Sequence, residues 1–120
     1  MIWLWVAAAG GAGAVVRYLV DLAVTTNIGG DAPWGTWVVN VTGSFLAGVV
    51  AGLVIREMVT LELSAVVAGG FLGAYTTFST AMVQAALQVE EPPRIAGIVN
   101  LVGTLVASLL AAFGGVALVS

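Results

Sequence analysis

The side chains that could do chemistry in this sequence are neutral hydrogen-bonding groups set among apolar residues. Asn40 lies in one apolar stretch, and a second polar set recurs at every fourth position, which places its members on one face of a helix. That set is Asn100, Thr104 and Ser108. Amide and hydroxyl donors can replace part of the water shell of an anion, or they can hydrogen-bond between helices. The chain has no His and no Cys, and it offers no nucleophile–base pair or metal-ligand cluster, so the sequence predicts that it is not an enzyme.

The segment from Gly69 to Thr80 is a poor helix former inside another apolar stretch. It holds three glycines, three threonines and a serine, and both Gly and β-branched Thr weaken a helix. Inside a membrane, a helix break is tolerated only where protein or a cavity covers the backbone, and carbonyl groups freed there can coordinate a cation. The alternative is a continuous helix with a close-packed glycine face.

Two charges fall within an apolar stretch near the start of the chain. Arg17 and Asp21 are four residues apart, so they can pair on one helix face. We expect them to form a structural ion pair near the membrane interface, or to act where ions enter the protein.

The composition shows which elements must position these side chains. Hydrophobic residues make up 61% of the 120 residues and charged residues 8%, whereas about a quarter of a soluble domain is charged. The charge-free windows 32–55, 63–89 and 95–120 are each long enough for one membrane crossing, which needs about 20 residues, and a fourth crossing starts at residue 2. The sequence therefore predicts an all-α, four-helix transmembrane protein with a broken third helix. We expect one membrane domain over 1–120, with helices at about 2–25, 35–55, 63–88 and 95–118.

The positive charges give no preferred orientation in the membrane. Four crossings place Arg56 on one side and Arg94 on the other, and the chain has no Lys, so the positive-inside rule favours neither direction. A chain without this bias can insert both ways, and two opposed copies can then pair. The net charge of −3 argues against a nucleic-acid partner.

Three motifs carry a resemblance to a known family. They are Gly10-Gly11-x-Gly13-Ala14-x-x-Arg17-Tyr18, Gly35-Thr36-x-x-Val39-Asn40-x-x-Gly43-Ser44-Phe45 and Gly70-Phe71-x-Gly73-x-x-Thr76-Thr77-Phe78-Ser79-Thr80. In this order and in a chain of this length, they resemble the bacterial fluoride channels of the Fluc or CrcB type. The resemblance implies an antiparallel dual-topology dimer in the inner membrane, which exports fluoride passively from the cytoplasm and lowers its toxicity. It also implies a structural Na⁺ at the dimer centre, which is not transported and is held by the backbone carbonyls of Gly73 and Thr76.

The resemblance further implies the residues of the anion path. Asn40 matches the pore asparagine of the family and Phe78 the first of two pore phenylalanines. With the neighbouring hydroxyls, the predicted path consists of Asn40, Phe78, Ser79, Thr80, Thr104 and Ser108. Arg17 matches the arginine of the first helix.

Ala81 stands where the family usually has its second phenylalanine. Either a homodimer conducts with a reduced aromatic lining, or the chain pairs with a homologue that keeps the second ring. Two alternatives to a channel built by this chain remain at this point. One is a small proton-coupled exporter, for which Asp21 is the only candidate acid, and the other is a non-conducting subunit of a heterodimeric channel.

Overall fold

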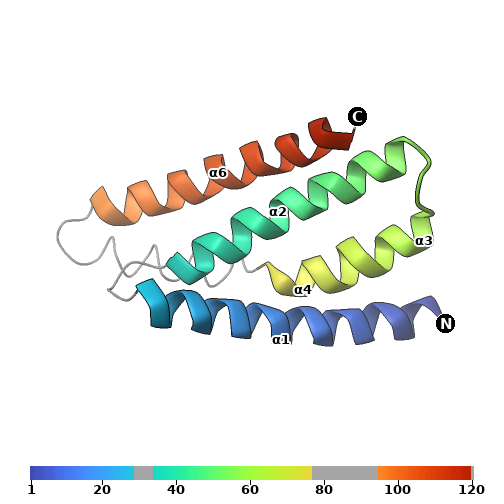
Figure 1. The fold of residues 1–120 in the computed structure, drawn as a ribbon, viewed down its shortest axis with the longest axis horizontal. Helices are drawn as coiled ribbons and strands as arrows, with labels where there is room; N and C mark the ends of the chain where they lie inside the picture. The colour runs from blue at the N-terminus through green and yellow to red at the C-terminus, as the bar shows by residue number, and fades with distance from the viewer. Residues whose placement is uncertain (29–33, 77–94, 120) are drawn as a thin grey trace.

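The computed structural model describes residues 1–28, 34–76 and 95–119, and within them the chain is helical apart from one turn and the helix ends. The helices are α1 (Ile2–Ile28), α2 (Trp34–Ile55), α3 (Leu61–Ser64), the π-helical segment η1 (Ala65–Leu72), α4 (Gly73–Tyr75) and α6 (Ile95–Val119). Figure 1 shows α3, η1 and α4 as one continuous rod. The prediction of an all-α chain is confirmed for these residues.

Three of the helices are long and apolar enough to cross a membrane, namely Ile2–Ile28, Trp34–Ile55 and Gly97–Val119. The rod from Leu61 to Tyr75 is apolar but shorter. Regular helix ends there because Thr76 has extended backbone, with φ −80° and ψ 152°. The predicted helix over 63–88 is therefore described only as far as Tyr75, and its remainder lies outside the described residues.

The π-helical segment η1 was not predicted from the sequence. Wide helical turns of this kind are rare and frequently lie at functional sites. The backbone N–H of Gly73 donates to the carbonyl of Ala68, five residues earlier, which is the hydrogen bond that defines such a turn. The described part of this segment is thus a widened helix with a helix end at Tyr75, and the break of the third helix stays a prediction.

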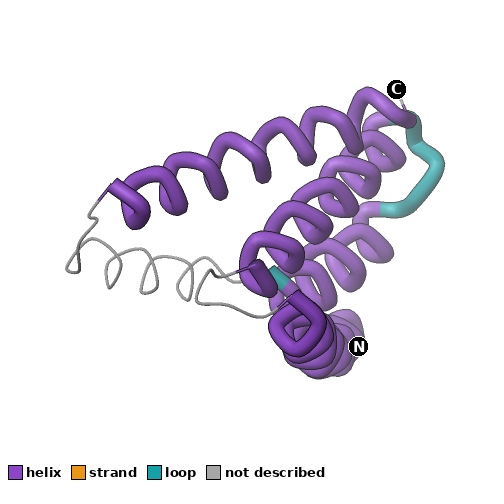
Figure 2. The backbone as a smooth tube through the Cα atoms, turned by 60° about the vertical axis from the view of Figure 1, so that its left-hand side comes forward, coloured by secondary structure: helices purple, strands orange, loops and turns teal. Residues whose placement is uncertain are grey.

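α2 is the central helix of the described bundle. Its most extensive contact is with α6, while α1 packs mainly against η1, α4 and α2. Figure 2 shows α1 and α6 on opposite sides of α2. Both termini lie at one end of the bundle, next to the turn that joins α2 to α3 (Figure 1), as an even number of crossings requires.

Glycines bring the helix backbones close together at these contacts. A Cβ atom on Gly48 would overlap the carbonyl of Ala112 on α6, and one on Gly115 would overlap the carbonyl of Phe45 on α2. Gly13 on α1 meets the backbone of Phe71 in the same way. Small residues at helix contacts are typical of membrane bundles, where packing rather than the hydrophobic effect associates the helices.

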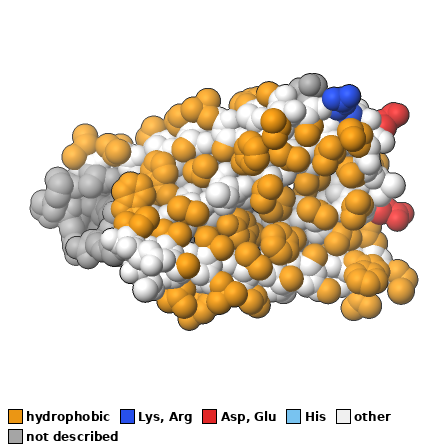
Figure 3. Space-filling view, viewed as in Figure 1, with side chains coloured by type: hydrophobic (Ala, Val, Ile, Leu, Met, Phe, Trp, Pro, Cys, Tyr) orange, Lys and Arg blue, Asp and Glu red, His pale blue; other side chains and the backbone are white. Residues whose placement is uncertain are grey.

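The distribution of polar and apolar side chains is the reverse of that in a soluble protein. Apart from glycines, most of the buried residues among those described carry a polar group. They are Thr36, Asn40, Asn100, Thr104 and Tyr75, whereas only Val39 and Leu72 are wholly apolar. Large apolar side chains point outward, with Trp3 81% and Phe113 71% exposed. On the face drawn in Figure 3, hydrophobic side chains cover the surface, and the visible charged groups gather at the end that carries the termini. Such a surface fits contact with lipid.

The turn between α2 and α3 is closed by a regular helix-ending motif. The N–H of Met58 donates to the carbonyl of Leu53 at 2.9 Å and that of Glu57 to Val54 at 2.9 Å, while Glu57 has a left-handed φ of 58°. Two such bonds around a left-handed residue form the Schellman motif, which usually has Gly at that position. Thr60 then starts α3 by accepting a hydrogen bond from the N–H of Leu63 at 3.1 Å.

Replacing Glu57 with glycine is expected to stabilise the protein by about 1 kcal/mol, because glycine has no Cβ to oppose the left-handed backbone. The measurement is thermal unfolding of purified protein in a mild detergent. Met58→Gly serves as the control, since Met58 has no positive φ and gains nothing from glycine. An unchanged or lowered midpoint for Glu57→Gly would show that the side chain of Glu57 has a stabilising role that outweighs this strain.

Candidate functional site

A cavity lined mainly by residues with polar side chains, here called the polar cavity, lies between α2, the helix end at Thr76, and α6. It has a volume of about 190 Å³, is partly open, and is lined by Asn40, Ser44, Thr76, Thr104, Leu105 and Ser108. The structure therefore brings together residues from three separate segments that the sequence singled out. Ser44 and Leu105 complete the lining.

The described lining of this cavity carries no charged side chain. Its polar groups are one amide and four hydroxyls. Asn40 and Thr104 are buried, at 7% and 8% exposed, and Ser44, Thr76 and Ser108 are partly buried. Neutral N–H and O–H groups can donate to an anion without the strong attraction of a buried cation. The cavity is thus suited to a small anion that must both enter and leave.

Thr76 closes the helix beside this cavity through both its backbone and its side chain. Its N–H and its Oγ1 each donate to the carbonyl of Leu72 at 3.0 Å, and its methyl group lies against Gly43. Gly73 belongs to the last described turn of this helix, and the last carbonyls of a helix generally lack a partner within it. Gly73 is exposed, and a Cβ there would lie 3.6 Å from the nearest atom, the carbonyl oxygen of Ala68.

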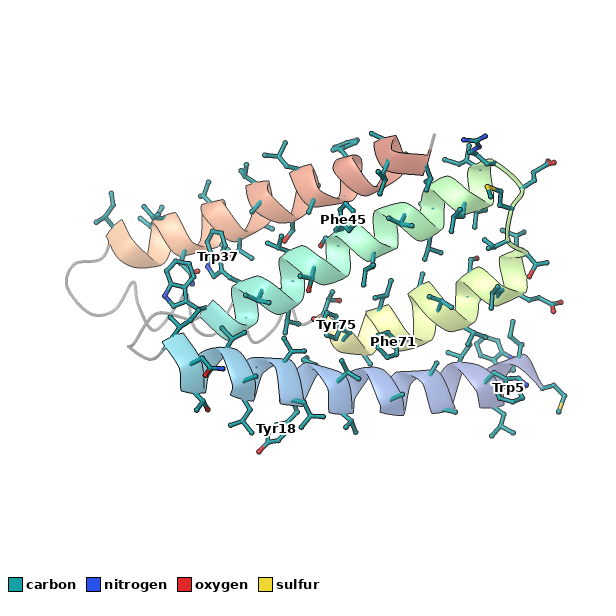
Figure 4. All side chains as sticks on the ribbon, in the orientation of Figure 1. Trp5, Tyr18, Trp37, Phe45, Phe71 and Tyr75 are labelled. Atoms are coloured by element: carbon teal, nitrogen blue, oxygen red, sulfur yellow. The ribbon has the colours of Figure 1, made fainter. Side chains whose placement is uncertain are left out.

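Tyr75, which the sequence analysis did not single out, is buried next to the cavity and carries a hydroxyl group. Thr42 donates to the carbonyl of Val38 at 2.6 Å, so the hydroxyl of Tyr75 is the donor in its 3.0 Å bond to Thr42. Its ring stacks on Phe71 with a centroid distance of 6.1 Å, and Figure 4 shows both rings on the rod that ends in α4. A tyrosine within an apolar stretch needs such a partner, which is the sequence signal that could have identified it.

The stripe of Asn100, Thr104 and Ser108 is divided in the structure. Thr104 and Ser108 line the cavity, whereas the Oδ1 of Asn100 accepts a hydrogen bond from the indole Nε1 of Trp37 on α2. Figure 4 shows Trp37 between α2 and α6. Asn100 therefore forms a hydrogen bond between two helices, which is the second of the two roles that the sequence analysis considered for such side chains.

Arg17 and Asp21 are not paired in the structure. Asp21 is exposed, its carboxylate lies against Gly35 in the first turn of α2, and it accepts a long hydrogen bond of 3.4 Å from Thr25. A negative charge is favoured near a helix N-terminus, so the contact with α2 replaces the pair predicted from the spacing. Whether Arg17 acts where ions enter the protein stays a prediction.

The rest of the predicted path lies outside the described residues. It comprises Phe78, Ser79 and Thr80, together with the departure at Ala81. Their roles stay predictions, as does the coordination of Na⁺ by the carbonyls of Gly73 and Thr76.

Comparison with known proteins places the chain in a family. Residues 4–116 match the model for the CrcB-like protein, Camphor Resistance (CrcB) family. The chain is 42% identical over 120 residues to the fluoride-specific ion channel FluC 1 of Symbiobacterium thermophilum, covering 98% of this chain and 97% of that one. It is 40% identical over 116 residues to the fluoride-specific ion channel FluC of Rhizobium meliloti, covering 96% of this chain and 93% of that one.

A third relative is the fluoride-specific ion channel FluC 2 of Mycobacterium tuberculosis, which is 40% identical over 115 residues, 95% of this chain and 87% of the relative. These matches extend over nearly the full length of both partners and include the segments that form the polar cavity. The chain, a multi-pass protein of the cell's inner membrane, therefore belongs to the CrcB-like family.

Proposed function

We propose that this chain forms a fluoride-selective channel that lets fluoride leave the cytoplasm passively, the activity that the names of its relatives give to those proteins. The observation that carries the proposal is the cavity between α2, α4 and α6, where neutral donors converge at membrane depth. Fluoride is small and strongly hydrated, so a pore must offer donors in place of the lost water. The cavity offers the amide of Asn40 and several hydroxyls for this purpose.

A passive pore agrees better with these side chains than a proton-coupled exporter does. Coupling requires an acid deep in the membrane that is exposed in turn to each side. Asp21 lies against Gly35 at the end of α1, away from the cavity lining, and is exposed. The proposed conduction needs no proton donor and no catalytic residue.

The channel we propose is an antiparallel dual-topology dimer. The cavity is partly open among the described residues of one protomer, and a second copy would enclose it. Gly69 and Gly73 also support a second copy, because both are exposed and a Cβ at Gly69 would meet nothing within 4 Å. Exposed glycines within a membrane helix allow close approach of another helix. Arg56 and Arg94, on opposite sides, leave both orientations open.

The same dimer would hold a structural Na⁺ at its centre, where the breaks of two opposed third helices meet. The described residues contain no cluster of acidic side chains that could bind a cation. We therefore propose that main-chain oxygens at the end of the third helix coordinate the ion. The helix end at Tyr75 supplies them, through the carbonyls of Gly73 and Thr76. When bound, the ion would neutralise the converging carbonyl dipoles and join the two protomers.

Ala81 leaves two forms of this dimer to be separated. A homodimer would conduct with one aromatic ring fewer in each pore, whereas a heterodimer would obtain the missing ring from a homologue. The absence of charge bias supports the homodimer, because one chain can then supply both orientations.

The proposed function predicts that the purified chain alone releases fluoride from liposomes. With both anions loaded, fluoride should leave quickly under a potassium-valinomycin shunt while chloride remains inside, as ion-selective electrodes would record. Equal release of both anions would contradict selectivity. Release of neither, restored by adding a homologue that has the second phenylalanine, would establish the heterodimer instead.

A further inference from the structure

A tryptophan on the central helix shares its hydrogen-bond acceptor with a hydroxyl of the cavity lining. The Nε1 of Trp37 donates to Oδ1 of Asn100 across the contact between α2 and α6, one turn from Asn40. The hydroxyl of Thr104 donates to the same oxygen at 3.5 Å. Thr104 lines the cavity, whereas Asn100 does not. A single amide oxygen thus connects the indole of Trp37 to a hydroxyl of the proposed anion path.

The chemistry of the indole fixes the orientation of the Asn100 amide. An indole N–H can only donate, so the atom of Asn100 that faces it must be the carbonyl oxygen and not the NH₂ group. Asn100 is 9% exposed, and a buried carbonyl oxygen without a donor is costly. This oxygen therefore requires a donor, and within the described part of the chain Trp37 and Thr104 both reach it.

The indole is held in place by a fitted contact rather than by chance. A Cβ at Gly103 on α6 would come within 2.7 Å of a carbon of the Trp37 ring, so only glycine leaves room for it. On its other side, Trp34 packs at a centroid distance of 6.5 Å with the planes tilted by 55°. This packing restricts the rotamers of Trp37, so the indole N–H stays directed at Asn100.

Thr104 holds its proton differently from the other threonines near the cavity. Thr42 and Thr76 donate to backbone carbonyls one helical turn earlier, at 2.6 and 3.0 Å. The bond of Thr104 goes to a side chain and is longer, at 3.5 Å, so it is weaker. Of these three hydroxyl groups, that of Thr104 therefore donates the weakest hydrogen bond to the protein.

We infer that Trp37 is a positioning residue of the anion path: by satisfying the Asn100 oxygen, it allows the Thr104 hydroxyl to turn its proton toward a passing anion. This inference rests on the proposed channel function. Without the indole donor, Thr104 becomes the sole donor to a buried oxygen. Its proton is then held away from the cavity, which receives oxygen lone pairs that repel fluoride.

Trp37→Phe keeps an aromatic ring against Gly103 but removes the donor. We expect it to lower the single-channel fluoride current about tenfold, the factor that corresponds to one hydrogen bond to an ion. Adding Asn100→Leu should restore most of the current, since the oxygen that retains Thr104 is then gone and replacing both partners by apolar groups is nearly neutral. In a Thr104→Val background, Trp37→Phe should cause no further loss.

The experiment measures current and dimer content for each variant, with Trp34→Phe as the matched control. This change keeps an aromatic ring against Trp37 and removes an indole N–H that is not bonded to Asn100, from a side chain that is 48% exposed. A wild-type chain that passes no fluoride would refute the proposed function itself. A conducting wild type with full current in Trp37→Phe would overturn the inference alone. If the double variant Trp37→Phe/Asn100→Leu conducts less than Trp37→Phe alone, the inference is also overturned, because Trp37 then acts through helix packing.

A second variant is needed if Trp37→Phe fails to assemble. Gly103→Ala displaces the indole, so it should lower the current, and adding Asn100→Leu should restore it. If either result fails, the inference is overturned.

Discussion

Replacing Asn40 with alanine is expected to remove most of the fluoride flux while the protein still assembles. The Asn40 amide carries two N–H donors, is 7% exposed and lines the polar cavity. Without it, fluoride must leave part of its water shell with no replacement at that level of the path. Loss of a hydrogen bond to an ion at a shielded site costs about 1.5–3 kcal/mol, so we expect the flux to fall at least about tenfold and up to about a hundredfold.

Flux and dimer content must be measured on the same Asn40→Ala preparation. Asn27→Ala is the matched control, because Asn27 donates to the carbonyl of Ala23 at the exposed end of α1 and does not line the cavity. If Asn40 serves only to join helices, dimer content will fall before flux per dimer does. An intact Asn40→Ala dimer that conducts at the wild-type rate would disprove the proposed path.

Replacing Gly73 with leucine should separate the protomers and remove fluoride flux together. Gly73 is exposed among the described residues, and a Cβ there would lie 3.6 Å from the nearest of their atoms, an ordinary contact. The loss that we expect therefore comes from the larger leucine side chain meeting the partner and the Na⁺ that we propose between the protomers. A leucine there also favours continued helix, which would withdraw the Gly73 carbonyl from the ion.

Thr76→Val should be much milder. It removes the bond from Oγ1 to the Leu72 carbonyl but leaves the backbone bond from the Thr76 N–H to that carbonyl, at a cost of about 1 kcal/mol. Its own carbonyl, the proposed ligand, is unaltered.

These variants can be compared by crosslinking in liposomes, in Na⁺ and with Na⁺ replaced by N-methylglucamine. Gly114→Leu is the control, since Gly114 is an exposed glycine on α6 and a Cβ added to it would meet nothing within 4 Å. Wild type should lose dimer when Na⁺ is removed, and Gly73→Leu should be monomeric in both media. A dimeric, conducting Gly73→Leu protein would rule out this face as the site of the ion.

The membrane-crossing helices could be predicted from the sequence because charges are excluded from the apolar core. The charge-free window 32–55 contains α2, and the window from residue 95 contains α6, with bounds close to those expected. Apolar length and charge are properties of a segment alone, so no knowledge of packing is needed. The form of the helix from Ala65 to Leu72 was not accessible in this way, because a π-helical turn depends on how the rod fits against α1.

Contacts between distant segments account for what the sequence could not predict. Trp37 and Asn100 are 63 positions apart. Neither local sequence shows that the Asn100 amide would bond to an indole instead of lining the cavity with Thr104 and Ser108. Arg17 and Asp21 show the converse case. An ion pair with an exposed member contributes only about 0.5 kcal/mol, so the contact of Asp21 with the start of α2 is enough to displace it.

The dependence of α2 on α6 has a consequence for biosynthesis. α6 packs chiefly on α2, yet α2 enters the membrane earlier, because the α3–α4 rod is made between them. Until α6 arrives, Trp37 and Asn40 on α2 lack the cover that α6 later gives them, and this side of α2 must be shielded by the insertion machinery or by another nascent chain. A ribosome that pauses before Ile95 would thus leave an intermediate suited to recognition by membrane quality-control proteases, and the rate at which the last helix is delivered would set the yield of channel.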